Sequence, residues 1–359
     1  MTNVFEDAFA AKKPVKFTLD FSGVILPRKS PFDKIAALAV LSRHNRRDIE
    51  SLRYYTANEC SEEQFKAWDA ERVYPIDIGH RKYHKAGAKS ATAWLASRYL
   101  LPLSRGEQEL LRLVNENNRT GNLKQGGDMR IAFLIRELYE LDESDEWALE
   151  VIIECQNVIL SYLDVEDGMA VRSADEPMDE ALTHLAKKLA KDSEKPFSLG
   201  RYLRDLWLLG GSSEDIQRRV AFWRDNSQRL ERERARAKGE FALMERNEFG
   251  IGDMKCLVLR TSDHFLAKAA ARSKQYWARI IIADDGHVAI STEGLDVRGL
   301  AAELTQMEPE RWYANNEMGA LINGGPQYTS VEPTKFGAGM LIKLMRKHLR
   351  KPVHGDNKK

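Results

Sequence analysis

Cysteine is scarce in this chain of 359 residues, which contains only Cys60, Cys155 and Cys256. Their number is odd and they lie far apart, so they form neither a disulfide framework nor a set with zinc-ligand spacing. Such sparse cysteine is typical of proteins in a reducing compartment. We therefore expect a cytoplasmic protein.

Long apolar runs are missing as well, and no stretch approaches the roughly 18 consecutive apolar residues that a transmembrane helix needs. The first residues, MTNVFEDAFAAKKPVKF, place Glu6 and Asp7 where a secretory signal would have basic residues and then an apolar core. These features predict a protein without a membrane partner.

A large excess of charge is also absent, because 55 lysine and arginine residues stand against 54 aspartate and glutamate residues. The net charge of +1 argues against a protein that coats nucleic acid over its whole surface, but it permits a local basic groove. The P-loop and the G-x-S-x-G nucleophile motif do not occur either. The commonest nucleotide-hydrolase and serine-hydrolase motifs are thereby excluded.

What the chain does contain, between residues 15 and 78, is an alternation of strand-like and helix-like patterns. VKFTLDFSGVIL, LRYYT and RVYPIDI are typical of strands, and FDKIAALAVLSRH and SEEQFKAWDAE lie between them with helical spacing. This order predicts βαβ units and a parallel sheet. In such sheets the functional site lies at the carboxyl ends of the strands.

The rest of the chain predicts a helical region and a second α/β unit. Residues 87 to 247 have helical spacing, with a loop at 171–180 and a charged, solvent-facing helix at 212–241. From residue 253, MKCLVLRT predicts a strand, HFLAKAAARSK a helix, ARIIIADDGHVAIST a hairpin turned at Asp285-Gly286, and VRGLAAELTQM a helix. LINGG, residues 321–325, then predicts a glycine turn before the helix KFGAGMLIKLMRKHL.

We therefore predict an α/β fold in three parts. Residues 1–165 form an α/β domain with a parallel sheet and appended helices, and residues 166–247 form a helical connector. Residues 248–359 form a smaller α/β domain of the substrate-binding type, ending in a basic tail.

The stretch YPIDIGHRKYHKAG, residues 74–87, is the first candidate for chemistry. Asp77 follows a strand, and His80 and His84 follow within seven residues. A carboxylate and imidazoles can bind a divalent ion, but histidines among Arg81, Lys82 and Lys85 are also common in solvent-exposed loops. This stretch alone supplies too few ligands to decide between the two.

Four places along residues 20–345 resemble the DHH superfamily of manganese-dependent phosphoesterases, especially the branch of melanocyte-proliferating-gene-type exonucleases. The order and spacing of these places match the family better than their letters do. They are ILPRKSPFDKIAAL with Asp33, PIDIGH followed by RKYHKAGAKSATAWLA, LLRLVNENNRTG with Asn117 or Asn118, and LINGGPQYTSVEPTKF.

The resemblance implies a metal site and a phosphate site. Asp33, Asp77 and His84 would bind manganese or another divalent ion, with His80 as a further ligand, and Asp77 and His84 would be catalytic. The substrate-binding residues would be Arg28, Lys85, Asn117, Asn323, Gly324 and Gly325. Where the family has further ligands, this chain has Arg28, Lys29 and Lys85, so the pocket holds either one ion or none.

Several of these residues also have a purely structural interpretation. Asp33 stands at the beginning of a predicted helix, where aspartate is a favoured cap. Asn117 and Asn118 lie where a helix C-cap is expected, and Asn323 with its glycines is equally well explained as a plain turn.

Two hypotheses for function stay open. One is a manganese-dependent phosphodiesterase, a hydrolase of the nuclease kind, that cleaves short oligonucleotides or a nucleotide. The other is a DHH-like protein with a degenerate active site, which binds a nucleotide or short single-stranded nucleic acid, or serves as a subunit of a larger assembly or a homo-oligomer.

Overall fold

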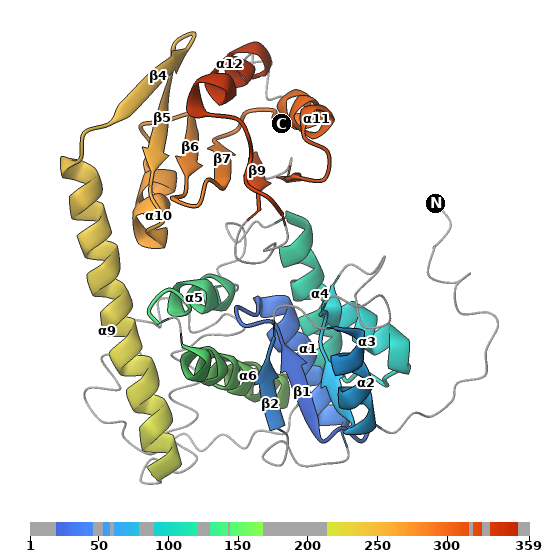
Figure 1. Ribbon diagram of the computed structural model, residues 1–359. Coiled ribbons are helices and arrows are strands. Elements are labelled where there is room, and N and C mark those ends of the chain that lie inside the picture. Colours follow the sequence, from blue (N-terminus) through green and yellow to red (C-terminus); the bar gives the residue numbers. More distant parts are fainter. Residues whose placement is uncertain are drawn as a thin grey trace, which may run out of the picture. The chain divides into compact units, whose positions relative to one another are not determined.

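The computed structural model describes residues 19–45, 53–57, 61–78, 90–120, 130–142, 144–167, 214–315, 319–324 and 331–350 (Figure 1). The chain divides into two compact units. Unit 1 comprises residues 1–119, 126–135 and 142–217, and unit 2 comprises residues 120–125, 136–141 and 218–359.

Unit 1 contains the predicted parallel sheet, with strand order β2-β1-β3. Its strands are β1 (Gly23–Leu26), β2 (Arg53–Thr56) and β3 (Val73–Pro75), and β1 pairs in parallel with both neighbours. The crossover helices are α1 (Phe32–His44) and α2 (Glu62–Ala70). Every residue of β1 is buried, which is the pattern of a central parallel strand covered on both faces. The prediction of βαβ units is confirmed.

Unit 1 also contains α3 (Ala91–Tyr99), α6 (Asp145–Glu166), and the greater part of α4 (Arg105–Thr120) and of α5 (Arg130–Leu138). Helix α1 packs against α3 and α6, and α6 also packs on β2. Burial of apolar residues along α1 and α6 forms the core of this unit. The predicted loop at 171–180 lies outside the described residues.

Helix α9 (Glu214–Leu243) confirms the predicted charged helix. It buries an apolar stripe that includes Trp223, Leu230 and Phe241, whereas its exposed side has i,i+3 and i,i+4 ion pairs of Arg236 with Glu233 and Glu240. Such pairs stabilise a solvent-exposed helical face only by a few tenths of a kcal/mol each, roughly 0.2–0.5. The buried stripe therefore contributes more to holding α9 in place.

Unit 2 contains a mixed six-stranded sheet with the order β4-β5-β6-β7-β9-β8. The strands are β4 (Asn247–Ile251), β5 (Met254–Arg260), β6 (Ala278–Ile282), β7 (Val288–Thr292), β8 (Trp312–Asn315) and β9 (Ala320–Asn323). Only β5 and β6 pair in parallel, joined by α10 (His264–Arg272). The β6–β7 hairpin turns at Asp285-Gly286 as predicted, with Gly286 at φ +88°.

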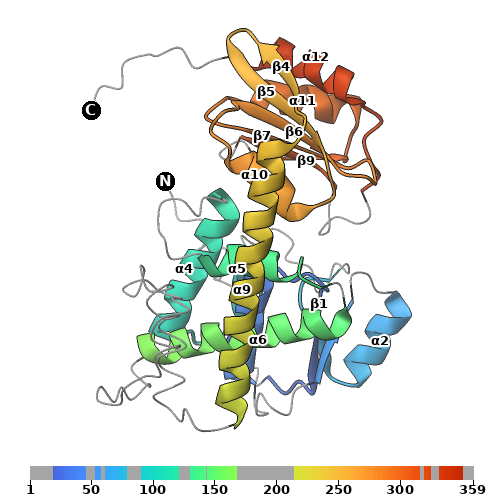
Figure 2. The same cartoon turned by 90° about the vertical axis from the view of Figure 1, so that its left-hand side faces the viewer.

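Helices cover both faces of this sheet, as Figure 2 shows. α11 (Arg298–Met307) and α12 (Ala338–His348) pack on one face with Cys256, Ile280 and Leu321. α10 and Phe241 pack on the other face with Leu257 and Leu259. Alternate residues of β5 therefore point into different cores, as strand geometry requires.

Three elements of unit 2 differ from the sequence expectation. Leu321 to Asn323 lie in strand β9 rather than in a turn, and Gly324 follows the strand with φ +66°. Strands β4 and β8 were not predicted, and β4 is an edge strand with three exposed residues in the five-residue sequence NEFGI. An edge strand of this composition has no apolar alternation by which to recognise it.

No helix among the described residues combines the length and the apolar character that crossing a membrane requires. Cys155 and Cys256 carry free, buried thiols. Burial raises the pKa of both thiols, most strongly that of Cys155, so they behave as core residues rather than as nucleophiles.

Candidate functional site

The carboxyl ends of β1 and β3, with the starts of α1 and α3, form one edge of the unit 1 sheet, here called the carboxyl edge. Asp33 lies in the first turn of α1 and is only 3% exposed. Its Oδ2 accepts hydrogen bonds from Ala91 N–H at 2.9 Å and from Asn118 Nδ2 at 3.0 Å. Its Oδ1 accepts from the main-chain N–H of Thr92 at 3.2 Å and lies 3.3 Å from the Thr92 hydroxyl.

These contacts make Asp33 a cap of α3 rather than of its own helix. The N-cap residue of α3, Ser90, accepts from Ala93 N–H at 3.0 Å, and Asp33 takes the two preceding N–H groups. The first donors of α3 are thus satisfied by a hydroxyl and a carboxylate, and a negative charge there also suits the helix dipole. A capping role was expected, but for α1, whose N-cap Pro31 makes no side-chain bond.

Asp77 follows β3 and adopts φ +50°, a left-handed conformation that aspartate tolerates better than most residues. Its side chain is 6% exposed and lies 3.2 Å from the ammonium of Lys34 on α1. The same ammonium donates to the main-chain oxygen of Asp77, also at 3.2 Å. Lys34 therefore neutralises Asp77 and fixes its backbone.

The structure brings Asp33 and Asp77 to the same edge but directs them to different partners. Asp77 and Ala91 line one shallow hollow that has no room for a water molecule, and Ala91 is also a donor to Asp33. His80, His84 and Lys85 lie outside the described residues. Arg28 forms an exposed ion pair with Asp145 at 2.9 Å.

The described residues of the carboxyl edge do not fit a manganese ion. Each oxygen of Asp33 already faces two hydrogen-bond donors, so a metal could bind only after α3 had lost its cap. The ammonium of Lys34 beside Asp77 would repel a dication. Within the described part of the chain, no three histidine, cysteine, aspartate or glutamate side chains are grouped to hold a metal.

The asparagines predicted at a C-cap lie inside α4 instead. Asn117 is half-buried, and its neighbour Asn118 is the residue that reaches Asp33. Asn115, one helical turn before Asn118, accepts a hydrogen bond from the hydroxyl of Ser90 at 2.7 Å. These two amides thus support the start of α3, and the local sequence NENNRTG offered no signal for that long-range contact.

Asn323 and Gly324, expected to hold a phosphate, have structural partners in unit 2. Asn323 is fully buried, and its amide donates to the oxygens of Arg311 at 3.0 Å and Glu332 at 3.2 Å and accepts from Thr334 N–H at 2.7 Å. Gly324 has φ +66°, and a Cβ there would lie 2.2 Å from the His287 ring. The amide of Asn323 thus secures the end of β9, and Gly325 lies outside the described residues.

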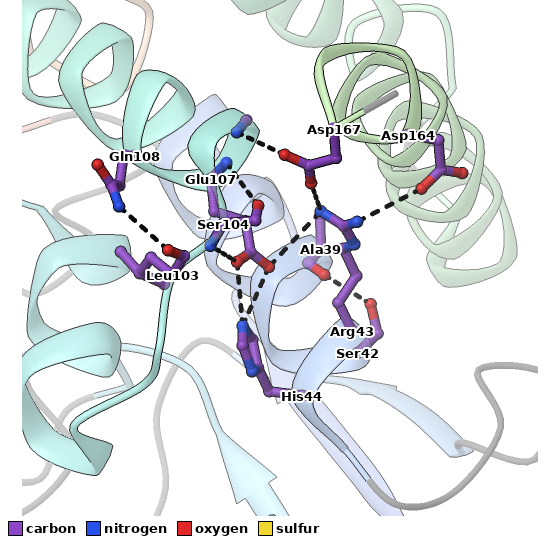
Figure 3. A network of polar contacts seen from close by, with 11 residues as sticks. Ala39, Ser42, Arg43, His44, Leu103, Ser104, Glu107, Gln108, Asp164 and Asp167 are labelled. Carbon is purple, nitrogen blue, oxygen red and sulfur yellow. Dashed lines mark hydrogen bonds and ion pairs between the residues drawn. The ribbon is translucent and has the colours of Figure 1, made fainter. Parts of the chain in front are cut away.

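Sequence reasoning missed a polar network at the ends of three helices, which we call the Arg43 network (Figure 3). It joins Arg43 and His44 at the end of α1, Glu107 at the start of α4, and Asp164 and Asp167 at the end of α6. Arg43 lies 2.7 Å from Asp167, 3.7 Å from Asp164 and 3.8 Å from Glu107. His44 Nε2 lies 3.1 Å from Glu107.

The electrostatics of this network point to a structural role. Burial raises the pKa of Glu107, but hydrogen bonds from His44 and Ser104 and the charges of His44 and Arg43 outweigh it, so the pKa is lowered. Ser104 and Glu107 bond reciprocally through side chains and main-chain N–H groups, which is a capping box. The sequence SRGE at residues 104–107 carries the only local signal for this arrangement.

No protein-family model and no curated protein matches this chain. Among solved structures it is similar to the crystal structure of an uncharacterized protein from Helicobacter pylori G27. The two are 13% identical, and the match covers 90% of this chain and 98% of that chain with a TM-score of 0.28. A likeness this weak establishes neither a shared fold nor a shared function.

Proposed function

We propose that this chain binds a phosphate-bearing ligand, a nucleotide or a short single-stranded nucleic acid, at the carboxyl edge of its parallel sheet. The supporting observation is the segment 79–89, GHRKYHKAGAK, which connects Ile78 after β3 with Ser90 before α3. It contains Arg81, Lys82, Lys85 and Lys89 and no acidic residue. Ligands of open α/β sheets bind at this edge, and lysine and arginine attract phosphate through charge-assisted hydrogen bonds.

The charges of the described residues support binding further. Two carboxylates of this edge, Asp33 and Asp77, already have partners. Asp33 accepts hydrogen bonds from main-chain N–H groups at the start of α3, and Asp77 forms an ion pair with Lys34. The charge of Asp77 is matched by Lys34, and the charge of Asp33 is stabilised by neutral hydrogen-bond donors and the α3 dipole, whereas segment 79–89 contributes four basic residues. The carboxyl edge consequently favours an anion over a divalent cation.

The hydrolytic hypothesis requires Asp33 and Asp77 to change their partners. A manganese-dependent phosphodiesterase would require Asp33 to leave α3 and Asp77 to leave Lys34 before either could bind an ion. The contacts of Asp33 therefore favour the DHH-like binding protein with a degenerate site, alone or as a subunit of an assembly.

Fluorescence polarisation with a labelled short single-stranded oligonucleotide tests the proposal. We expect the double variant Lys82→Gln/Lys85→Gln to bind about tenfold or more weakly, and the slope of log K against log salt to fall by about 1.4, for two lost phosphate contacts. The matched control Lys66→Gln/Lys238→Gln removes two exposed lysines from α2 and α9 and should bind like the wild type.

The same titration separates the two hypotheses when it is run in chelator and in manganese. Binding in chelator without cleavage in manganese supports the receptor. Cleavage that appears only with manganese would replace the receptor by the phosphodiesterase, and equal affinities of wild type and double variant would remove segment 79–89 from the site.

A further inference from the structure

Helix α12 of unit 2 has an exposed face made of basic side chains alone. Its opposite face is apolar and packs on the sheet through Leu341, Leu344 and Met345. The exposed side chains between residues 338 and 350 are all basic: Lys343, Arg346, Lys347 and Arg350. Each lies three or four residues from two of the others, so the four form one stripe along the helix. We call it the basic stripe.

Most of the charge of the basic stripe is not matched by a carboxylate among the described residues. Lys347 pairs with Glu303 of α11 at 2.8 Å, but the other three side chains have no such partner there. The sequence from residue 333 to residue 355 contains six lysine and arginine residues and no aspartate or glutamate. A solvent-facing helix usually intersperses both signs, as α9 does around Arg236. A purely basic face therefore indicates an anionic partner.

The two arginines of the basic stripe are held in place without being neutralised. Arg346 Nε donates to the main-chain oxygen of Gly250 in β4 at 3.1 Å, and Arg350 Nη1 donates to the oxygens of Arg346 and Leu349 at 2.7 Å and 2.9 Å. These acceptors are uncharged, and a guanidinium has five N–H donors, so donors and charge remain for a ligand. The helix dipole favours cations in the last turn, but Lys343 lies before that turn.

The composition and the spacing of the basic stripe identify the kind of partner. An amphipathic helix binds a membrane surface through its apolar face, and the apolar face of α12 is already buried on the sheet. Protein interfaces have aromatic anchors at their centre, which the basic stripe does not contain. At 1.5 Å per residue, its charges lie about 5 Å apart along about 10 Å of helix. Such a row suits a line of single negative charges better than the clustered phosphates of one nucleotide.

We propose that the basic stripe binds the phosphate backbone of single-stranded nucleic acid, whatever its base sequence. Lys343, Arg346 and Arg350 would each contact phosphate oxygens through charge-assisted hydrogen bonds. The choice of a single strand rests on the proposed function, but the basic stripe itself does not depend on segment 79–89. It makes nucleic acid, rather than a mononucleotide, the partner of this chain.

Fluorescence polarisation with labelled oligothymidylate, in chelator, tests the basic stripe. The triple variant Lys343→Gln/Arg346→Gln/Arg350→Gln should bind about tenfold or more weakly, and the slope of log K against log salt should fall by about 2, for three lost phosphate contacts. Lys343→Gln alone removes a side chain that has no hydrogen bond or ion pair in the described part of the chain, so it leaves the contacts of α12 intact. Its slope should fall by about 0.7.

Three further measurements separate the basic stripe from the net charge and from the proposed phosphate site. The control variant removes three exposed basic residues from α2 and α9 and should bind like the wild type: Lys66→Gln/Arg232→Gln/Lys238→Gln. Thymidine monophosphate should have the same affinity for the triple variant and the wild type, because one phosphate does not need the basic stripe. In the Lys82→Gln/Lys85→Gln background, the triple variant should lower the slope by the same amount, so failure of the proposed phosphate site would leave this result intact.

Several outcomes would overturn the proposal. Equal affinities and salt slopes of the triple variant and its control would show that the basic stripe does not contact the strand. Tighter binding of a duplex than of oligothymidylate would contradict the choice of a single strand. Binding to phosphatidylserine vesicles that is lost in the triple variant, without binding of oligothymidylate, would replace nucleic acid by a lipid surface.

Discussion

At the scale of the residue, Asp33 has different consequences as a helix cap and as a metal ligand. Asp33→Ala leaves the Ala91 and Thr92 N–H groups buried without acceptors, and we expect the free energy of unfolding to fall by about 2–3 kcal/mol. Asp33→Asn keeps one acceptor oxygen and should lose less, about 1 kcal/mol. Urea denaturation of the three proteins gives these values directly.

Manganese distinguishes the two roles of Asp33 in the same experiment. As a cap, Asp33 stabilises the wild type equally with and without the ion, because no binding energy is linked to folding. A wild type whose unfolding free energy rises with manganese, while that of Asp33→Ala does not, would contradict the cap. Asp225→Ala, which removes an exposed aspartate from α9, serves as the control for a general effect of losing a carboxylate.

The sequence predicted that Asp33 and Asp77 lie at the carboxyl edge, but it did not predict which residues they contact. The order strand, Asp33, strand, Asp77 placed both carboxylates at one edge of the sheet, and the structure agrees. Asp33 contacts α3, which lies 58 residues further along the chain, and no local pattern reports such a contact. For the same reason the sequence did not predict the hydrogen bond of Asn118 to Asp33 or the main-chain partners of Asn323.

At the scale of the element, the Arg43 network fixes how α1, α4 and α6 meet, and it makes stability depend on pH. The pKa of Glu107 is lower in the folded protein than in the unfolded chain, so its contribution is full above the usual glutamate value and is lost as the pH falls through the lowered folded value. We expect Glu107→Gln to cost about 1–2 kcal/mol near neutral pH. That difference should shrink below about pH 4.5 in urea titrations.

Asp164 serves as a control for Glu107, because its pKa is shifted in the opposite direction. Burial raises its pKa, against the lowering charge of Arg43 and together with the raising charge of Asp167. A raised carboxyl pKa means that ionisation works against the folded state above that value, so Asp164→Asn should not destabilise the protein near neutral pH. Equal losses of unfolding free energy in Glu107→Gln and Asp164→Asn would contradict this arrangement of the network.

Periodicity predicted most helices and central strands because burial imposes it. Strand β7 alternates in burial, β5 and β6 contain the apolar runs CLVL and III, and α10, α11 and α12 each have an apolar face, so these sequences indicate which residues are buried. Strand β4 was not predicted because an edge strand buries few side chains. LINGG was assigned to a turn because its glycines outweighed the strand signal of Leu321 to Asn323. Capping signals such as Ser104 with Glu107 mark where a helix begins but not what it contacts.

At the scale of the whole molecule, the chain passes between unit 1 and unit 2 several times. Residues 136–141 belong to unit 2, although the segments 126–135 and 142–217 on either side belong to unit 1. The helical pattern of residues 131–141 is continuous, so nothing in the sequence marks this change. The contacts of Glu137 show what holds these residues to unit 2.

Glu137 is 1% exposed and accepts hydrogen bonds from Arg234 on α9 and, at 2.7 Å, from Lys268 on α10. Burial raises its pKa, but these two cations outweigh burial and lower it, so Glu137 is ionised at neutral pH. Glu137→Gln removes the buried carboxylate that faces Lys268 and Arg234, and we expect unit 2 to lose about 2–3 kcal/mol of stability.

Hydrogen exchange followed by mass spectrometry measures the two units separately. Amides of β5, β6 and β7 should lose protection in Glu137→Gln, whereas those of β1 in unit 1 should exchange as in the wild type. The control Glu150→Gln, at an exposed position of α6, should leave both sheets unchanged. Loss of protection in β1 together with β5 would mean that the units unfold as one, and loss in β1 alone would place residues 136–141 with unit 1.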